Sequence, residues 1–258
     1  MNAFSELLEK IGLKGKGHEE KEPKDEGGFA ERMRRLTDVG EAFEGVKEEE
    51  IFSSILETDI GNIRHTLEGL DKAAFCTAVD MLQNARNIYI LGIRSCEPLA
   101  DFLGFYLNMM FDNLHVIRTS SASEIFEQML HIGPGDVLVG ISFPRYSMRT
   151  LKAMEFANSR SAGVIAITDH IHSPMNLYSS CNLLAESQMA SIVDSLTAPL
   201  SVINALVVAL AVRRQAQMKE SLQSMEEIWQ DYQFYGNDEI DQPAEGVEIW
   251  QRGENKHE

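Results

Sequence analysis

Hydrophobic residues fall into five short runs that are separated by segments with helical spacing. The runs lie at residues 87–92, 114–119, 137–142, 163–168 and 181–186. Each is mostly apolar rather than alternating, which is typical of a strand buried on both faces. Strands that alternate with helices predict an α/β fold, a five-stranded parallel sheet with helices on both faces. Ligands of such sheets bind beyond the carboxyl ends of the strands, so the residues that follow each strand are the functional candidates.

Helical spacing also precedes and follows these runs. Two helices are expected before the first strand, one over residues 51–70 and one that ends near residue 85, with Asp71 as the N-cap of the second. A long helix is expected from about Ser195 to Lys219. Its part 196–212 is apolar almost all round, which predicts burial in an oligomer, and its proline and asparagine argue against a membrane span.

Three regions follow from this pattern. Residues 1–50 form a flexible N-terminal region, because residues 14–28, KGKGHEEKEPKDEGG, are rich in glycine and charge and have almost nothing to bury. Residues 51–220 form the globular domain. Residues 221–258 form an acidic C-terminal tail.

Charge and cysteine content narrow the classes of function. The chain of 258 residues has 40 acidic and 23 basic side chains, a formal net charge of -17. Such a chain is a poor whole-surface match for DNA, because affinity for nucleic acid comes largely from Lys and Arg. Three cysteines without a CxxC motif fit a reducing compartment, and the N-terminus lacks the features of a signal peptide. The sequence therefore predicts a cytoplasmic protein with no disulfide framework and no membrane contact.

Two turns between a strand and a helix have similar chemistry. The first, LGIRSCEP at 91–98, contains Arg94 and Ser95, and the second, GISFPRYS at 140–147, contains Ser142, Arg145 and Ser147. The N-terminus of a helix presents unpaired N–H groups and binds anions, to which serine hydroxyls and arginine add further donors. Both turns are expected at the same edge of the sheet, where they would together bind one phosphate-bearing ligand.

A purely structural interpretation of these turns stays open. Ser95 and Ser147 would then be ordinary N-caps, and the two arginines would pair with surface carboxylates. Neither turn is a P-loop, and the chain has no GxGxxG motif, so a dinucleotide is not expected. Cys96 lies near the start of the helix that is expected after the first strand, a position that lowers the pKa of a thiol.

Several segments resemble a known family. LGIRSCEPLADFL, SASEIFEQML, GDVLVGISFPRYSMRTLKAMEFA and VIAITDHIHSPM are similar to the SIS (sugar isomerase) domain of the RpiR/MurR-type bacterial transcription regulators. The resemblance covers roughly residues 51–218. It implies a five-stranded parallel sheet that binds a phosphorylated sugar, a dimer or tetramer, and no cofactor.

The resemblance also implies roles for particular residues. Ser95 matches the serine after the first strand. Ser142 and Ser147 match the first serine and the final Ser/Thr of the Ser-x-Ser-Gly-x-Thr phosphate loop of the family. Pro144 stands where the second serine would be, and Arg145 stands where the glycine would be. One hydroxyl donor is thereby lost, and one guanidinium is gained.

The N-terminal region departs from the family. RpiR-type regulators carry a helix-turn-helix domain before the SIS domain. No complete three-helix DNA-binding domain and no basic recognition helix fit into residues 1–50. The expectation is a DNA-binding part that is lost or incomplete in this sequence, with direct DNA contact doubtful.

An enzyme remains the alternative. Asp194 stands where sugar-phosphate SIS enzymes have a glutamate, and an isomerase needs such a base to move a proton. Its competing interpretation is a cap of the long helix, together with Ser195. His170 and His172 follow the fourth strand, but no partner ligands at metal-binding spacing accompany them, so no metal is expected.

Three hypotheses result. The leading one is a sensor that binds a phosphorylated sugar through Arg94, Ser95, Ser142, Arg145 and Ser147 and has no catalytic residue. The second is a phosphosugar isomerase or lyase that uses Asp194 or a histidine. The third is an interaction protein that dimerises through residues 196–212 and has an unused pocket.

Overall fold

The computed structural model describes residues 45–118, 121–188 and 194–231. Most of the predicted N-terminal region 1–50 and most of the predicted tail 221–258 lie outside these described residues. The elements, in chain order, are α3 (Glu48–Glu68), α4 (Lys72–Gln83), β1 (Ile88–Gly92), η1 (Arg94–Cys96), α5 (Glu97–Leu107), β2 (Leu114–Val116), α6 (Ala122–Gln128), β3 (Val137–Ile141), α7 (Met148–Ser159), β4 (Gly163–Thr168), η2 (Pro174–Leu177), β5 (Cys181–Leu184), α8 (Thr197–Arg213) and α9 (Gln215–Asp231).

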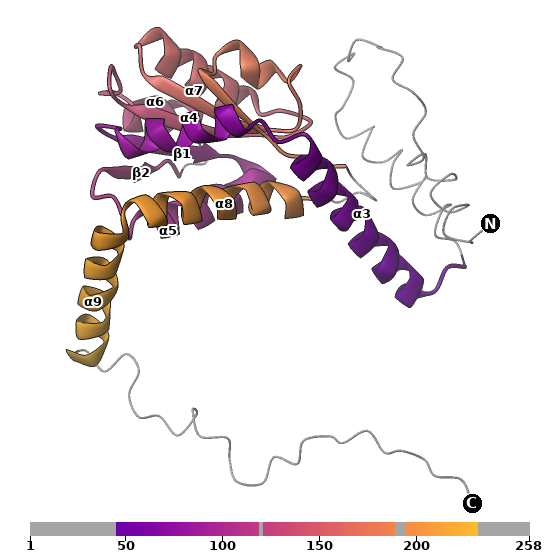
Figure 1. The fold of residues 1–258 in the computed structure, drawn as a ribbon. Coiled ribbons are helices and arrows are strands. Elements are labelled where there is room, and N and C mark those ends of the chain that lie inside the picture. Colours follow the sequence, from indigo (N-terminus) through magenta and orange to yellow (C-terminus); the bar gives the residue numbers. More distant parts are fainter. Residues whose placement is uncertain (1–44, 119–120, 189–193, 232–258) are drawn as a thin grey trace, which may run out of the picture. The chain divides into compact units, whose positions relative to one another are not determined.

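A parallel sheet lies at the centre of the domain (Figure 1). In the described residues it has five strands in the order β2-β1-β3-β4-β5, and all neighbours are parallel. Helices α6 and α7 cover one face, and α5 and α8 cover the other (Figure 1). The fold predicted from the alternating pattern is therefore confirmed.

Burial on both faces explains the short apolar runs. Every residue of β1 and β3 is buried. Tyr89 and Leu91 of β1 belong to the core cluster on the side of α6 and α7, together with Met129 and Met154. The intervening residues point to the opposite face because side chains alternate along a strand. A strand with two covered faces needs apolar residues at all positions, so its sequence shows no alternation.

The order of the strands changes direction at β1 and β3. These strands are neighbours in the sheet, with Gly92 paired with Ile141 at their carboxyl ends, although β2 comes between them in the sequence. The chain leaves β1 toward β2 on one side and leaves β3 toward β4 on the other. The two turns that follow therefore diverge and leave a crevice, the usual position of a ligand site in this class of sheet.

Helix α3 turns an unusual face to the domain. Its two buried residues are the polar Ser54 and Asn62, whereas Leu56, Ile60 and Leu67 are exposed. The helix predicted from the apolar spacing is present, but its apolar side chains do not face the sheet. Polar contacts with the segment after β5 hold it instead.

The helix predicted from Ser195 to Lys219 is wrong in extent. Helix α8 ends at Arg213, and α9 begins at Gln215. The backbone of Arg214 leaves the helical region at φ -111° and ψ 33°, and its guanidinium lies 4.2 Å from the centre of the Phe111 ring. The chain divides into two compact units after Arg214. No single helix among the described residues is both long enough and apolar enough to cross a membrane.

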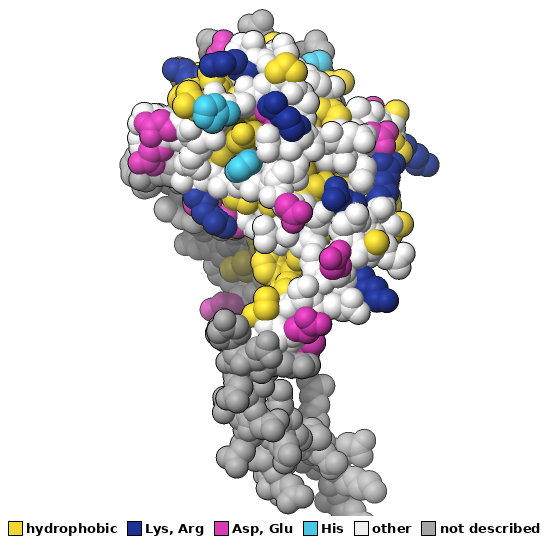
Figure 2. Space-filling view, turned by 90° about the vertical axis from the view of Figure 1, so that its left-hand side faces the viewer, with side chains coloured by type: hydrophobic (Ala, Val, Ile, Leu, Met, Phe, Trp, Pro, Cys, Tyr) yellow, Lys and Arg dark blue, Asp and Glu magenta, His cyan; other side chains and the backbone are white. Residues whose placement is uncertain are grey.

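Charged side chains are mixed on the face of the molecule that Figure 2 shows. Basic and acidic side chains of the described residues are interspersed there, and hydrophobic side chains lie in small groups between them. A DNA-binding face concentrates Lys and Arg in one patch or stripe. The described part of this face does not have that arrangement.

Candidate functional site

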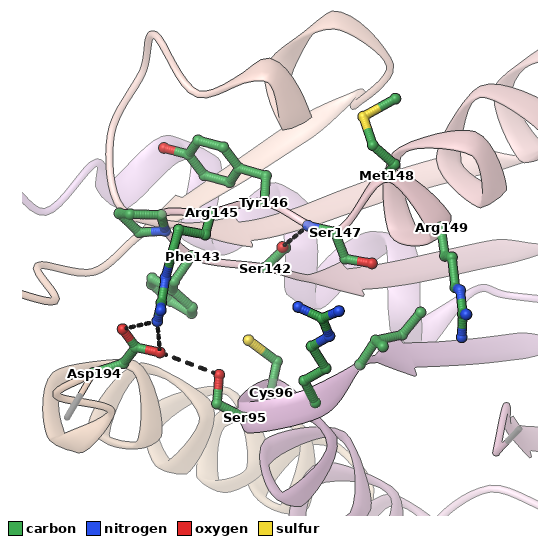
Figure 3. Close-up of a pocket in the computed structure, with 13 residues that line it drawn as sticks. Ser95, Cys96, Ser142, Phe143, Arg145, Tyr146, Ser147, Met148, Arg149 and Asp194 are labelled. Carbon is green, nitrogen blue, oxygen red and sulfur yellow. Dashed lines mark hydrogen bonds and ion pairs between the residues drawn. The ribbon is translucent and has the colours of Figure 1, made fainter. Parts of the chain in front are cut away.

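A cavity of about 680 Å³ lies beyond the carboxyl ends of β1 and β3 (Figure 3). Three parts of the chain line it: the turn after β1, the turn after β3 and Asp194, which lies between β5 and α8. The lining residues are Ile93, Arg94, Ser95, Cys96, Ser142, Phe143, Pro144, Arg145, Tyr146, Ser147, Met148, Arg149 and Asp194. The five binding candidates of the two turns and the catalytic candidate Asp194 are among them, whereas His170 and His172 are not, so the structure brings the two turns together at one cavity.

Glycine shapes the turn after β1. A Cβ added at Gly92 would lie 2.3 Å from the carbonyl oxygen of Cys96, which is closer than side chains approach backbone. The absence of a side chain thus lets η1 fold back over the end of the strand. Arg94 adopts a left-handed backbone with φ 59°. The N-cap of α5 is Cys96, so Ser95 is not the helix cap that one interpretation predicted.

Two serines shape the turn after β3. The Ser142 hydroxyl, which is almost completely buried, accepts a hydrogen bond from the Ser147 N–H at 3.0 Å (Figure 3). The Ser147 hydroxyl accepts one from the Thr150 N–H at 3.4 Å, so Ser147 is the N-cap of α7. Each hydroxyl keeps its own proton to donate. The arrangement places both donors and the N-terminus of α7 at the wall of the cavity.

Asp194 contributes a carboxylate to the same cavity. The Nη2 of Arg145 lies 2.6 Å from its Oδ1 and 2.7 Å from its Oδ2, and the Ser95 hydroxyl lies 3.4 Å from Oδ2 (Figure 3). Asp194 does not cap α8, since the N-cap residue is Leu196 and the Ser195 hydroxyl donates to Asp59 instead. The predicted cap is therefore wrong, and Arg145 pairs with a carboxylate, as the structural interpretation of the turn allowed.

The cavity retains cationic character. Besides Arg145, the guanidinium groups of Arg94 and Arg149 belong to residues that line it. Within the ranges that the structure describes, the Arg94 side chain makes no hydrogen bond or ion pair with another residue. Asp194 is the acidic residue among the lining residues, so the site has more positive than negative groups.

Cys96 lines the cavity with an uncharged thiol. Its side chain is buried, and burial raises the pKa of the thiol from 9.0 to about 11. The hydrogen bonds around it, including one with Ser95, act in the opposite direction but are weaker than the desolvation. The pKa lowering expected from its place near a helix start is therefore wrong, because burial outweighs the helix terminus.

A second polar cluster lies beside the cavity. The Tyr146 hydroxyl donates to Oδ1 of Asp169 at 2.7 Å, and His170 Nε2 lies 3.5 Å from Asp169 Oδ2. Burial and the bond to Asp169 raise the pKa of Tyr146 above its ordinary value. His172 is not among the cavity residues, and the described residues contain no group of three or more metal-ligating side chains.

The sequence did not single out every residue of the site. Phe143, Tyr146, Met148 and Arg149 also line the cavity. All four belong to the segment GISFPRYSMRTL, so their place in the turn was the available signal. The left-handed backbone at Arg145 helps to set how this segment faces the cavity, and the residue pattern does not reveal that conformation.

Comparison with known proteins identifies the domain. The profile described as the SIS domain matches residues 81–209, half of the chain. The chain belongs to the SIS domain family. The family expected from the sequence segments is thus confirmed, and the SIS domain covers both turns and Asp194.

Related proteins of the SIS domain include transcription regulators. The chain is 24% identical over 188 residues to the HTH-type transcriptional regulator HexR of Escherichia coli K12, which covers 70% of this chain and 63% of HexR. The chain thus spans less than two thirds of that relative. Among solved structures, the RpiR transcription factor of Sphaerobacter thermophilus (sugar isomerase domain) has a TM-score of 0.65 at 24% identity, over 68% of this chain and 97% of that one. The NanR protein of Vibrio vulnificus complexed with ManNAc-6P has a TM-score of 0.60 at 16% identity, over 70% of each chain. These structures share the fold of this chain.

Proposed function

We propose that the chain is a cytoplasmic sensor whose SIS domain binds a phosphorylated sugar in the cavity beyond β1 and β3. The observation that carries this proposal is the convergence of three serine hydroxyls, a helix N-terminus and an excess of arginine on one cavity. Its volume of about 680 Å³ suits a small molecule, since ligand cavities measure roughly 300–1,000 Å³. A phosphate needs several donors at once, which this cavity supplies.

Each group has a definite role in the proposal. The phosphate lies at the turn after β3, where Ser142 and Ser147 donate their hydroxyl protons and the first N–H groups of α7 point at it. Ser95 donates from the opposite turn. Arg94, with no partner in the described residues, supplies a charge-assisted bond. The hydroxyls of the sugar extend toward Tyr146 and Asp194.

The related proteins support the ligand class and the regulatory role. HexR and the RpiR factor are named as transcription regulators, and the NanR structure contains a phosphorylated amino sugar. We propose that this chain likewise reports the level of a phosphosugar, as a homo-oligomer. Direct contact with DNA is not part of the proposal, given a net charge of -17 and the mixed charges in Figure 2.

A thermal-shift screen tests the proposal. The panel consists of sugar phosphates and the same sugars without phosphate. A ligand at a hundred times its Kd adds about 2.7 kcal/mol of stability, which for a chain of this size raises the Tm by roughly 5 to 10 °C. We expect one or a few sugar phosphates to produce this shift and the unphosphorylated sugars to produce none.

Two variants and a control make the screen specific. Ser142→Ala and Arg94→Gln should each lose most of the shift, measured against the ligand-free Tm of the same variant. Ser159→Ala, at the far end of α7 and outside the cavity, should keep it. A flat response of the wild-type chain across the whole panel would contradict the proposal.

Isomerisation is a second candidate function, favoured by the presence of Asp194 in the cavity. A general base must accept a proton from the substrate. Both carboxylate oxygens of Asp194 already accept from Arg145, so proton transfer requires that this pair be broken. Turnover of a sugar phosphate that is lost in Asp194→Asn would favour the enzyme over the sensor.

A further inference from the structure

Two of the proposed phosphate-binding groups already hold an anion. Arg145 Nη2 contacts both oxygens of the Asp194 carboxylate, at 2.6 and 2.7 Å, and the Ser95 hydroxyl lies 3.4 Å from one of them. Arg145 and Ser95 come from the two different turns of the cavity. The carboxylate of Asp194 thus takes up one donor from each turn, donors that an anionic ligand in the cavity would also use.

We propose that Asp194 is an internal competitor of the ligand: its carboxylate pairs with Arg145, and the phosphate of the ligand displaces it. This inference rests on the proposed function, because it concerns the same cavity. It assigns to Asp194 control of the affinity of the site rather than catalysis.

Burial makes the competition energetically relevant. The side chains of Arg145 and Asp194 are only 24% and 15% exposed, so solvent screens their attraction less than in a surface pair. A phosphate bound at the turn after β3 would lie beside Arg145, which belongs to that turn. A dianionic group and the carboxylate then repel each other at close range while both are attracted to one guanidinium. The repulsion is removed when Arg145 exchanges its partner, the carboxylate of Asp194, for the phosphate.

The backbone conformation of Arg145 and the geometry of its contact both support the exchange of Asp194 for another anion. Arg145 has φ 70°, the left-handed conformation that glycine adopts most readily. The conformation sends its side chain across the cavity toward Asp194 (Figure 3). Both oxygens of Asp194 contact the same nitrogen, Nη2, and not two different nitrogens of the guanidinium. In a bidentate bridge, two guanidinium nitrogens each bind one carboxylate oxygen, and this contact lacks that geometry. The other N–H groups of the Arg145 guanidinium do not bind Asp194 and can meet a second anion.

Displacement of Asp194 would act on helix α3. The next residue, Ser195, donates its hydroxyl to Asp59 of α3 at 2.6 Å, and Thr197 donates to the other oxygen of Asp59 at 3.0 Å. The residues that enter α8 are therefore fixed on one side to the cavity, through Asp194, and on the other side to α3. Loss of the Arg145 pair weakens the attachment to the cavity and leaves the attachment to α3 in place. Occupancy of the cavity is thereby transmitted to the helix that follows residues 1–44 in the sequence.

Removal of the competing charge tests the inference. In Asp194→Asn, the full-length chain should bind both inorganic phosphate and N-acetylmannosamine 6-phosphate at least about fivefold more tightly than wild type, a typical coupling between linked contacts. Kd is measured by titration calorimetry for the sugar phosphate and by thermal shift for inorganic phosphate. Asp194→Ser, a second neutral substitution, should tighten binding in the same direction.

A matched control removes the same charge elsewhere. Asp101→Asn breaks the 2.7 Å pair with Arg118, and neither residue lines the cavity. Its Kd for both probes should equal that of wild type, which excludes an effect of net charge alone. Hydrogen exchange provides a readout that affinity does not give: phosphate should raise exchange at the start of α8 in wild type, and Asp194→Asn should show the raised rate without any probe.

The outcomes separate the two proposals. Unchanged or weaker binding in both Asp194 variants, with wild type still binding, would overturn the competition and leave the sensor function in place. Failure of the wild-type chain and the variants to bind either probe or any sugar phosphate of the screening panel would overturn the proposed function and this inference with it. Tighter binding in Asp101→Asn as well would show that net charge, and not Asp194, sets the affinity.

Discussion

Arg145 stands in a backbone conformation that most side chains avoid. Its φ of 70° is matched by a φ of 59° at Arg94 in the other turn of the cavity, so both turns use an arginine where glycine would be easier. A left-handed conformation costs a non-glycine residue about 1–2 kcal/mol. In return, each turn places a guanidinium at the cavity. Strain that is retained at a site of this kind points to a functional constraint.

Substitution of Arg145 by glycine and by alanine separates strain from charge. Both variants lose the pair with Asp194, but only glycine adopts φ 70° without strain. We expect Arg145→Gly to be about 1 kcal/mol more stable than Arg145→Ala in urea denaturation.

Lys152 provides the control for this comparison, because it lies exposed within α7. There the order should reverse, with Lys152→Ala about 1 kcal/mol more stable than Lys152→Gly, since glycine weakens a helix interior. An alanine variant at Arg145 that equals or exceeds the glycine variant would show that the turn carries no strain.

At the scale of elements, α3 is attached to the domain by polar groups rather than by its apolar side. The buried side chain of Asn62 donates to the carbonyl oxygen of Gln188 at 3.0 Å and accepts from the Gln188 N–H at 3.2 Å. The Thr66 hydroxyl accepts from the N–H of Glu186 at 2.9 Å. These bonds satisfy the backbone of the segment that leaves β5, where the strand ladder has ended.

Neighbouring substitutions in α3 should therefore have opposite effects on stability. Asn62→Ala removes both hydrogen bonds to the backbone of Gln188 and should lower the free energy of unfolding by about 1–3 kcal/mol, because each bond contributes about 0.5–1.5 kcal/mol. Gly61→Ala should raise it by about 0.5–1 kcal/mol, because an added Cβ meets no atom within 4 Å and alanine favours the helix. Urea denaturation measures both. Equal stability of Asn62→Ala and wild type would mean that α3 is held by other contacts.

The positions of the helices and strands were predictable from the sequence, whereas the side of a helix that faces the domain was not always predictable. Covered strands need apolar residues at every position, so the five runs located all five strands of the described sheet. Spacing also revealed α3, but apolar spacing does not tell whether a stripe faces the domain or a partner. The break at Arg214 has no glycine or proline that would mark it in the sequence, and the contact of Arg214 with the distant Phe111 is visible only in the folded chain.

The same holds for the cavity: residues of one turn could be found from the sequence, whereas contacts between residues far apart in the sequence could not. Ser142 and Ser147 were found as candidates because their turn directly follows a strand. The pair of Arg145 with Asp194 joins residues 49 positions apart and depends on how two connections meet above the sheet. Local pattern placed both residues at one edge, but only the folded chain shows that one neutralises the other.

For the whole molecule, the exposed stripe of α3 predicts association of two copies. Phe52, Ile60 and Leu67 are 66%, 53% and 69% exposed, and together with the exposed Leu56 and Ile63 they recur every three or four residues, as in a helix seam. Glu48, Glu49 and Glu50 lie in the first turn of α3, whereas Arg64 lies in its last part, together with one acidic residue, Glu68. Antiparallel pairing of α3 with the same helix of a second copy places these opposite charges together, which a parallel arrangement does not.

Light scattering after size exclusion should accordingly give twice the chain mass of 28.9 kDa for the wild-type chain. Ile60→Glu should shift the mass toward a single chain, because two buried carboxylates would face each other across the two-fold axis. Leu130→Glu replaces a residue that is 57% exposed outside the stripe and should leave the mass unchanged. A wild-type chain of single mass, or an Ile60→Glu variant that stays double, would contradict the pairing. With the pairing in place, Asp59 of each copy would lie on the helix that forms the interface. Asp59 binds Ser195 and Thr197, which follow the cavity residue Asp194, so that occupancy of either cavity acts on the association of both chains.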